Sequence, residues 1–281
     1  MTLRTFLLSV SLLLAASAWT GARAVPVITN GGFETTSFTA STQMNTTNVT
    51  GWSTSGYNFV FFPGTATTTG AASVQYGALI LQGTLPSGAS NGFPATSPSG
   101  GNFVGADGDF QVGAITQTIT GLTVGIQYAV SFYWGAAQQN GSAYTSATTE
   151  QWQVTLGSEL HSTPIINNPP QGFTGWLSQS LTYTATSTSE VLSFLAAGTP
   201  SGAPPFSLLD GVSITAVAEP ASWMTLVAAV LSIIGVANLR RRSSRLARLA
   251  AANGETPPAD RAGHAKPRRR RRRSYAHSAA C

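Results

Sequence analysis

The sequence lacks basic residues over most of its length. None of its 15 Lys and Arg lies between Val25 and Leu239, whereas 13 of them follow from Arg240 on. Without cationic groups, residues 25–239 cannot offer the clamps that hold phosphates and nucleic-acid backbones. The formal net charge of +5 therefore originates in the C-terminal end. No aromatic interleaving and no folded motif there supports sequence-specific nucleic-acid recognition.

Cysteine and histidine are also nearly absent. The only cysteine is Cys281, so no internal disulfide can form, and stability must come from a packed core. No cysteine near the N-terminus is available for lipid attachment. His161 is the only histidine between residues 25 and 239, which excludes a site of several histidines there.

The N-terminus has the composition of a secretory signal. Arg4 precedes an apolar run over Phe6–Ala18, and Ala22-Arg23-Ala24 has the small-x-small pattern that signal peptidase cleaves. Residues 1–24 are therefore predicted to be a signal peptide. The alternative is a permanent N-terminal anchor, because cleavage is inferred from side-chain size alone.

A long apolar run lies near the C-terminus. Residues Ala221–Leu239 contain 19 residues without a charge, which as a helix extend over about 29 Å, close to the hydrocarbon thickness of a bilayer. Three arginines, Arg240, Arg241 and Arg242, close the run in the manner of a stop-transfer cluster. The pattern predicts a transmembrane helix over 221–239 with the arginines in the cytoplasm and residues 25–216 exported. A buried core helix is the alternative.

Residues 217–242 combine a short acidic motif, this apolar run and the arginine cluster. The motif is Ala218, Glu219 and Pro220, and together the three features resemble the PEP-CTERM sorting signal of exopolysaccharide-producing Gram-negative bacteria. Ala218 stands where that family has proline. The resemblance implies an inner-membrane anchor with a periplasmic domain, an exosortase transpeptidase as partner, and release to the outer surface or extracellular matrix.

The last segment, residues 243–281, is predicted to be a basic, disordered cytoplasmic tail. The run Arg268–Arg273 repels itself and cannot pack. Residues Arg245–Ala252 form a short amphipathic piece. Contact with anionic lipid, nonspecific nucleic-acid binding and a purely topogenic role all remain open.

Apolar residues alternate with polar ones through residues 25–216. In Gln151–Leu156, for example, Trp152, Val154 and Leu156 fall on one side. Strands are predicted over Tyr128–Trp134, Gln151–Leu156, Leu181–Ala185, Val191–Leu195 and Leu208–Thr215. We expect an all-β domain, an antiparallel β-sandwich of eight to ten strands, with long loops over Gly83–Gly101 and Pro164–Gly175.

Short motifs at both ends of this domain add a second resemblance. Asn30–Glu34 with Gly51-Trp52, and the closing segment Leu208–Ile214, resemble galactose-binding-like jelly rolls, which include many carbohydrate-binding modules. The resemblance implies that the first and last strands lie together and that a structural Ca²⁺ is held there. Glu34 and Asp210 match the positions of its carboxylates. The alternative is that Glu34 caps a turn and Asp210 binds backbone.

Sugars stack on flat aromatic faces, so the aromatic residues are candidate ligand contacts. The candidates are Trp52, Tyr57, Trp134, Tyr144, Trp152 and Trp176. Trp134 and Trp152 share the parity of apolar neighbours and are assigned to the core. Trp176 and Tyr144 lie next to loops and are predicted to be exposed.

Catalytic signals are weak. Gly88–Gly92 fits the G-x-S-x-G nucleophile elbow but lacks the strand before it and the helix after it. His161 is interpreted as a turn residue, and Asp107-Gly-Asp109 as a turn rather than a calcium loop. We expect a surface or matrix protein that engages exopolysaccharide, is not an enzyme and requires no cofactor. A structural Ca²⁺ is the one addition that the resemblance implies. The alternative is a secreted hydrolase of polysaccharides or esters.

Overall fold

The structure is a computed structural model that describes part of the chain. The described residues are 25–68, 71–73, 77–217 and 222–252. The predicted signal peptide, the motif Ala218–Pro220 and the arginine run Arg268–Arg273 lie outside them. The chain divides into two compact units, Met1–Ala218 and Glu219–Cys281.

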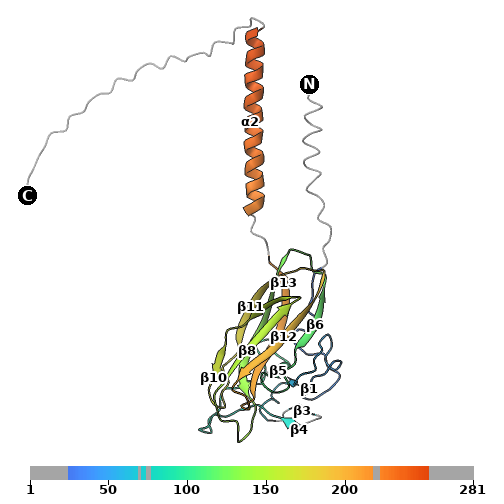
Figure 1. The fold of residues 1–281 in the computed structure, drawn as a ribbon, viewed down its shortest axis with the longest axis vertical. Coiled ribbons are helices and arrows are strands. Elements are labelled where there is room, and N and C mark those ends of the chain that lie inside the picture. Colours follow the sequence, from blue (N-terminus) through green and yellow to red (C-terminus); the bar gives the residue numbers. More distant parts are fainter. Residues whose placement is uncertain (1–24, 69–70, 74–76, 218–221, 253–281) are drawn as a thin grey trace, which may run out of the picture. The chain divides into compact units, whose positions relative to one another are not determined.

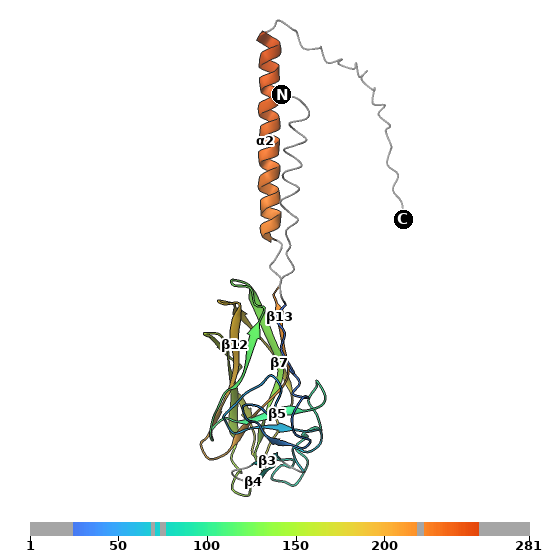
Figure 2. The same ribbon diagram turned by 90° about the vertical axis from the view of Figure 1, so that its right-hand side faces the viewer.

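The first unit is a β-sandwich whose two sheets form separate layers, with β12 in one layer and β7 and β13 in the other (Figures 1 and 2). The larger sheet has the order β11 (Leu177–Thr184), β7 (Gln127–Gln138), β13 (Pro205–Ala216), β5 (Phe103–Asp107), β2 (Asn58–Phe61), β1 (Thr42–Gln43), β3 (Ala71–Ser73) and β4 (Gly77–Leu79). The smaller sheet has the order β10 (Ile166–Asn168), β8 (Thr148–Leu156), β12 (Ser189–Thr199) and β6 (Ile115–Thr120), and β9 (Glu159–Ser162) also pairs with β8.

The prediction of an all-β sandwich is confirmed, and all five predicted strands are present in β7, β8, β11, β12 and β13. The expected number of eight to ten strands is wrong, because the described residues contain 13. Much of the excess is strands of two to four residues. One of them, β10, lies in the predicted loop Pro164–Gly175, where pairing with β8 supplies its hydrogen bonds. The loop Gly83–Gly101 contains no strand.

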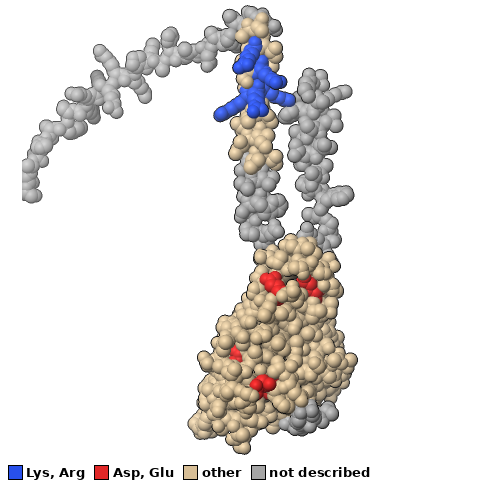
Figure 3. All heavy atoms as spheres, in the orientation of Figure 1, with Lys and Arg blue, Asp and Glu red and all other residues tan. Residues whose placement is uncertain are grey.

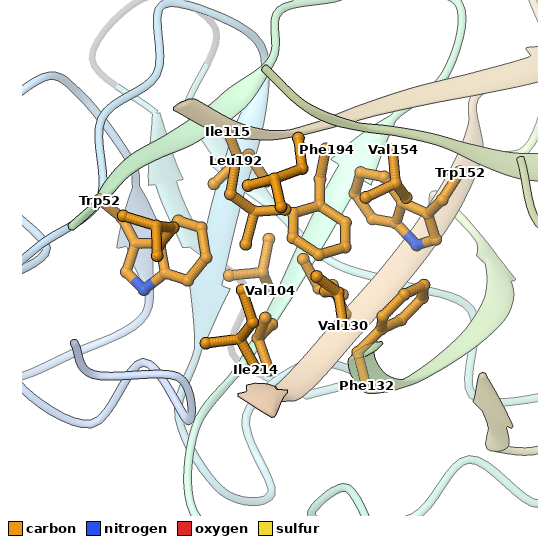
Figure 4. Packing of buried hydrophobic residues seen from close by; sticks show 14 of the residues in the cluster. Trp52, Val104, Ile115, Val130, Phe132, Trp152, Val154, Leu192, Phe194 and Ile214 are labelled. Atoms are coloured by element: carbon orange, nitrogen blue, oxygen red, sulfur yellow. The ribbon is translucent and has the colours of Figure 1, made fainter. Parts of the chain in front are cut away.

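One core fills the space between the sheets (Figure 4). Burial alternates along β8, so that Trp152, Val154 and Leu156 point inward as predicted. The ring of Phe194 lies near its centre, 5.1 Å from Phe132 and 5.9 Å from Trp152 between ring centroids, both edge-to-face. Such pairs add to the free energy gained by burying the aromatic surface.

A second core covers the opposite face of the larger sheet. Phe59, Phe61, Phe103 and Phe206 are fully buried there, together with Leu208. The residues that pack over them come from the segments before β5 and before β11, namely Ala66, Leu79, Leu81, Phe93, Phe173 and Trp176. Strands β2 and β5 are therefore buried on both faces, and their burial does not alternate. This explains why a pattern of period two did not reveal them.

The second unit contains helix α2, Ser222–Ala252. It continues through Arg240–Arg242, so the prediction of disorder from residue 243 is wrong for residues 243–252. Leu, Ala and Arg favour the helix over this stretch. Among the described residues, the structure contains no helix that is long and apolar enough to span a membrane. The predicted span 221–239 lies partly outside the described residues, which include neither residue 221 nor the side chains of 222–229, and it stays a prediction.

Candidate functional site

Charge is sparse on the sandwich. The visible face in Figure 3 has isolated acidic groups and no basic ones, whereas basic side chains are seen on α2. Of the acids in this unit, Asp107, Glu150 and Asp210 are almost completely buried. Three carboxyl groups of the domain are therefore shielded from solvent.

The Asn30–Glu34 motif lies directly against the last strand. Val212 donates its N–H to the carbonyl oxygen of Gly31 at 2.9 Å. A Cβ on Gly31 would lie 2.0 Å from the Val212 oxygen, so only glycine permits this approach. The two ends of the domain thus lie together as expected, but residues 30–33 form a turn rather than a first strand, with Phe33 N–H donating to Asn30 O.

Glu34 and Asp210 lie close together beside this turn. A Cβ placed on Gly32 would be 3.7 Å from Asp210 Oδ1 and 3.8 Å from Glu34 Oε1. Glu34 Oε1 also accepts the N–H of Asn102 at 2.8 Å. The ladder of β13 is irregular just after Asp210, and Gly211 has a φ of 62°. Such bulges redirect neighbouring side chains.

Asp210 is fully buried and only partly satisfied. Ser97 Oγ donates to Asp210 Oδ2, whereas Oδ1 has no hydrogen-bond partner. Burial raises the pKa of Asp210, the hydrogen bond from Ser97 opposes this shift and the nearby Glu34 carboxylate adds to it, so that the pKa is about 7.

Two carboxylates with one unpaired buried oxygen are the hard donors that Ca²⁺ prefers. Within the described part of the chain, no three His, Cys, Asp or Glu side chains form a metal-binding group. A cation beside Glu34 and Asp210 would therefore take its remaining ligands from backbone, amide or hydroxyl oxygens. The residues present fit such a site.

Asp107 and Asp109 form a turn, in agreement with their interpretation. Asp107 Oδ1 accepts the N–H groups of Asp109 and Phe110 at 2.9 and 3.0 Å. Asp109 Oδ2 accepts the N–H of Gly202 at 2.8 Å. Both side chains are thereby engaged by backbone.

Three partly exposed aromatic rings gather above the second core. Phe93 and Phe173 lie 4.7 Å apart between centroids, and Phe173 lies 6.4 Å from Trp176. Trp176 stands edge-to-face on the buried Phe103 at 5.6 Å. Its Nε1 is buried without a partner, so the surface that Trp176 exposes does not include its polar atom. We call Phe93, Phe173 and Trp176 the aromatic platform.

Glycines flank the platform. Gly92 and Gly175 have φ of 82° and 81°, and each has open space where a Cβ would lie. The amide of Asn91 ties the two loops together by donating to the carbonyl oxygens of Gln82 and Gln171. Hydrogen bonds therefore join the loops that carry the platform. A ligand can approach the backbone at Gly92 and Gly175, where no side chain is in the way.

The predicted ligand contacts fare differently. Trp176 and Tyr144 are both half-buried rather than exposed, and Tyr144 folds over Gly141 in its own loop. Sequence reasoning missed Phe93 and Phe173. Each follows a glycine in a loop, as Trp176 does, and this repeated Gly-aromatic pair is the signal that could have found them.

The catalytic candidates lie in different elements. Ser90 lies in the loop of the G-x-S-x-G pattern, and its Oγ accepts the N–H of Gly92 at 3.1 Å. His161 was interpreted as a turn residue, which is wrong, since it belongs to β9. Its Nε2 lies 2.8 Å from Glu159 Oε1, and its ring contacts Tyr183 edge-to-face.

Glu150 is a fully buried acid that the sequence analysis did not single out. Thr148 Oγ1 donates to Glu150 Oε1 at 2.5 Å, and Oε2 has no partner. Burial raises the pKa of Glu150 to about 8. Its shared parity with Trp152 along β8 was the available signal.

No protein-family model and no curated protein matches the sequence. Among solved structures, similar ones include TmCBM61 in complex with β-1,4-galactotriose, with TM-score 0.37, 14% identity, and coverage of 70% of this chain and 100% of that chain. Another is the CBM22-1 xylan-binding domain of Paenibacillus barcinonensis Xyn10C, with TM-score 0.34, 14% identity, and coverage of 71% and 100%. A family 35 carbohydrate-binding module from Clostridium thermocellum has TM-score 0.26, 16% identity, and coverage of 48% and 86%. Because these TM-scores are below 0.5, none of the ligands is transferred to this chain.

The buried acid predicts an unusual dependence of stability on pH. The pKa of Glu150 is raised from 4.5 to about 8 in the fold, so its contribution is fully present below pH 4.5 and is lost as pH rises through 8. The free energy of unfolding of Glu150→Gln, measured relative to that of wild type, should therefore increase by about 3 kcal/mol between pH 5 and pH 8. Denaturant unfolding at both values measures this, and parallel pH profiles for the two proteins would refute it.

Proposed function

We propose that the sandwich is a non-catalytic module that binds neutral polysaccharide at the cell surface or in the extracellular matrix. The observation that carries the proposal is the aromatic platform of Phe93, Phe173 and Trp176. Neighbouring rings in this cluster lie 4.7 to 6.4 Å apart between centroids, and the cluster rests on the buried Phe103.

Rings that are fixed from below suit a ligand with flat apolar faces. The platform is partly desolvated already, and its loops are joined through Asn91. A pyranose ring presents C–H groups to such a surface, and its hydroxyls remain available to backbone groups around Gly92 and Gly175. Preformed sites of this kind lose little conformational entropy on binding.

The charge distribution narrows the ligand class. No Lys or Arg lies within residues 25–217 to pair with sulfate, phosphate or uronate groups. A neutral exopolysaccharide is therefore favoured over an anionic one.

Removing the largest ring of the platform should weaken binding. Trp176→Ala is expected to weaken affinity for a neutral oligosaccharide at least tenfold, which corresponds to about 1.4 kcal/mol. Isothermal titration against a panel of neutral and acidic oligosaccharides measures this. The matched control is Tyr144→Ala, which removes a half-buried ring from a loop outside the platform and should leave affinity unchanged.

The same titrations separate the two functional classes. New reducing ends or released acid in the panel, lost on changing Ser90 or a carboxylate, would support the alternative of a secreted hydrolase. Equal losses of affinity in Trp176→Ala and Tyr144→Ala would show that the platform is not the binding site.

We also propose that Glu34 and Asp210 hold a structural Ca²⁺. The unpaired Oδ1 of Asp210 supports this, because a bound cation would both satisfy that oxygen and neutralise the adjacent pair of carboxylates. The ion would tie the N-terminal turn to β13 and supply no chemistry beyond charge compensation.

Calcium should then raise the melting temperature of wild type at pH 8 and have little effect at pH 5, where Asp210 is protonated. In Asp210→Asn the increase should disappear. Asp109→Asn is the control, because Asp109 is only partly buried and its carboxylate accepts the N–H of Gly202. Thermal scans with millimolar Ca²⁺ or Mg²⁺ give the answer, and an equal increase in wild type and Asp210→Asn would rule out this site.

We further propose that residues 217–242 act as the sorting segment, through the predicted helix 221–239 and an exosortase. Support comes from the order of acidic motif, apolar run and arginines in the sequence. The sandwich would then begin as a periplasmic domain attached to the inner membrane and afterwards reach the outer surface or matrix.

Processing at the motif should change the mass of the mature protein. Wild type should yield a species without α2 in the outer-surface or medium fraction, whereas Glu219→Ala should remain full length in the inner membrane. Mass spectrometry of both fractions tests this, with Glu255→Ala in the tail as control. A full-length protein in every fraction would contradict processing.

A further inference from the structure

The described sheets end in strands of very different length. β4 and β10 have three residues each and β9 has four. β6 has six residues, but Ser53 pairs with its Thr116. β11 has eight residues and pairs with β7 alone. It is the longest edge strand in the part of the chain that the structure describes.

The backbone groups on the free side of β11 can be identified. Thr184 N–H donates to Glu159 Oε2, and Ser180 O accepts a bond from the side chain of Gln179. Neither group therefore faces β7. Because N–H and C=O of one residue point to the same side in an antiparallel ladder, Ser178, Ser180 and Thr182 present their backbone groups outward.

This edge lacks the features that commonly prevent an edge strand from pairing with another chain. Its sequence, LSQSLTYT, contains no charge and no proline. Lysine, which often disfavours such pairing at an edge strand, is missing from the entire domain. Leu177 is 40% exposed at one end of the strand. At the other end, the carboxylate of Glu159 accepts the N–H of Thr184, so that only this end is already occupied.

We propose that β11 pairs antiparallel with β11 of a second copy of this chain and joins the two larger sheets across a two-fold axis. Centring the pairing on Ser180 places Ser178 opposite Thr182 of the second copy. These three pairs use the outward N–H and C=O groups of Ser178, Ser180 and Thr182 and leave Thr184 bonded to Glu159. Each pair exchanges two hydrogen bonds.

A second copy suits this edge because the same surface serves both partners. An isologous contact needs only self-complementarity, and an antiparallel strand meets that requirement. Hydroxyl side chains of Ser178, Ser180 and Thr182 would lie opposite one another without charge repulsion. The eight residues extend over about 27 Å, so the contact is small and should have a micromolar dissociation constant.

The association is tested with the purified full chain by analytical ultracentrifugation across about 1 to 100 μM, a range set by the expected affinity. Wild type should form a dimer. Ser180→Lys places like charges at the two-fold axis and Thr182→Pro removes an outward N–H, so each should raise the dissociation constant at least tenfold. Thr118→Lys, on the exposed face of β6, is the control and should leave it unchanged.

A cysteine pair locates the contact independently of stability. In a Cys281→Ser background, Ser180→Cys should form a disulfide-linked dimer under mild oxidation, because paired residues have Cα atoms about 5.5 Å apart. Thr118→Cys should not. A monomeric wild type, a dimer insensitive to Ser180→Lys, or equal crosslinking at residues 118 and 180 would each overturn the proposal. Glycan binding is measured separately and does not bear on this result.

Discussion

Strands β2 and β5 of the larger sheet are buried on both faces, and the arrangement of the surrounding loops follows from this double burial. One face packs on the smaller sheet around Phe194, and the other carries Phe59, Phe61 and Phe103 beneath two loops. Covering the second face requires apolar side chains in those loops. Phe93, Phe173 and Trp176 meet this need while remaining partly exposed. The same packing that completes the fold thus creates the aromatic platform.

The absence of basic residues is the second constraint. Buried acids in this domain have no Lys or Arg as partner, so Asp210 and Glu150 are satisfied by hydroxyl donors on one oxygen only. Burial then raises their pKa values. A cation can replace the missing partner for Asp210, where Glu34 is adjacent, whereas Glu150 keeps its proton. The same lack of lysine leaves the edge of β11 without a charge that would disfavour pairing with another chain.

The sequence predicted those elements whose pattern depends on one buried face. Strand β8 is an example, because Trp152, Val154 and Leu156 alternate with polar residues. Strands β2 and β5 escaped detection, since burial on both faces removes the alternation. The approach of Glu34 to Asp210 was expected from a resemblance, and the structure brings the two side chains together through the Gly31–Val212 contact. The platform could not be derived, because Phe93 and Phe173 meet only through loops 80 residues apart in sequence.

The proposed function makes Trp176 the point of contact with a neutral polysaccharide. The protein contains six tryptophans, namely Trp19, Trp52, Trp134, Trp152, Trp176 and Trp223. Fluorine NMR of protein labelled with 5-fluorotryptophan resolves them during titration with a neutral oligosaccharide. The Trp176 resonance should shift while those of the buried Trp52, Trp134 and Trp152 stay in place. A saturating ligand that leaves Trp176 unmoved would contradict the proposed function.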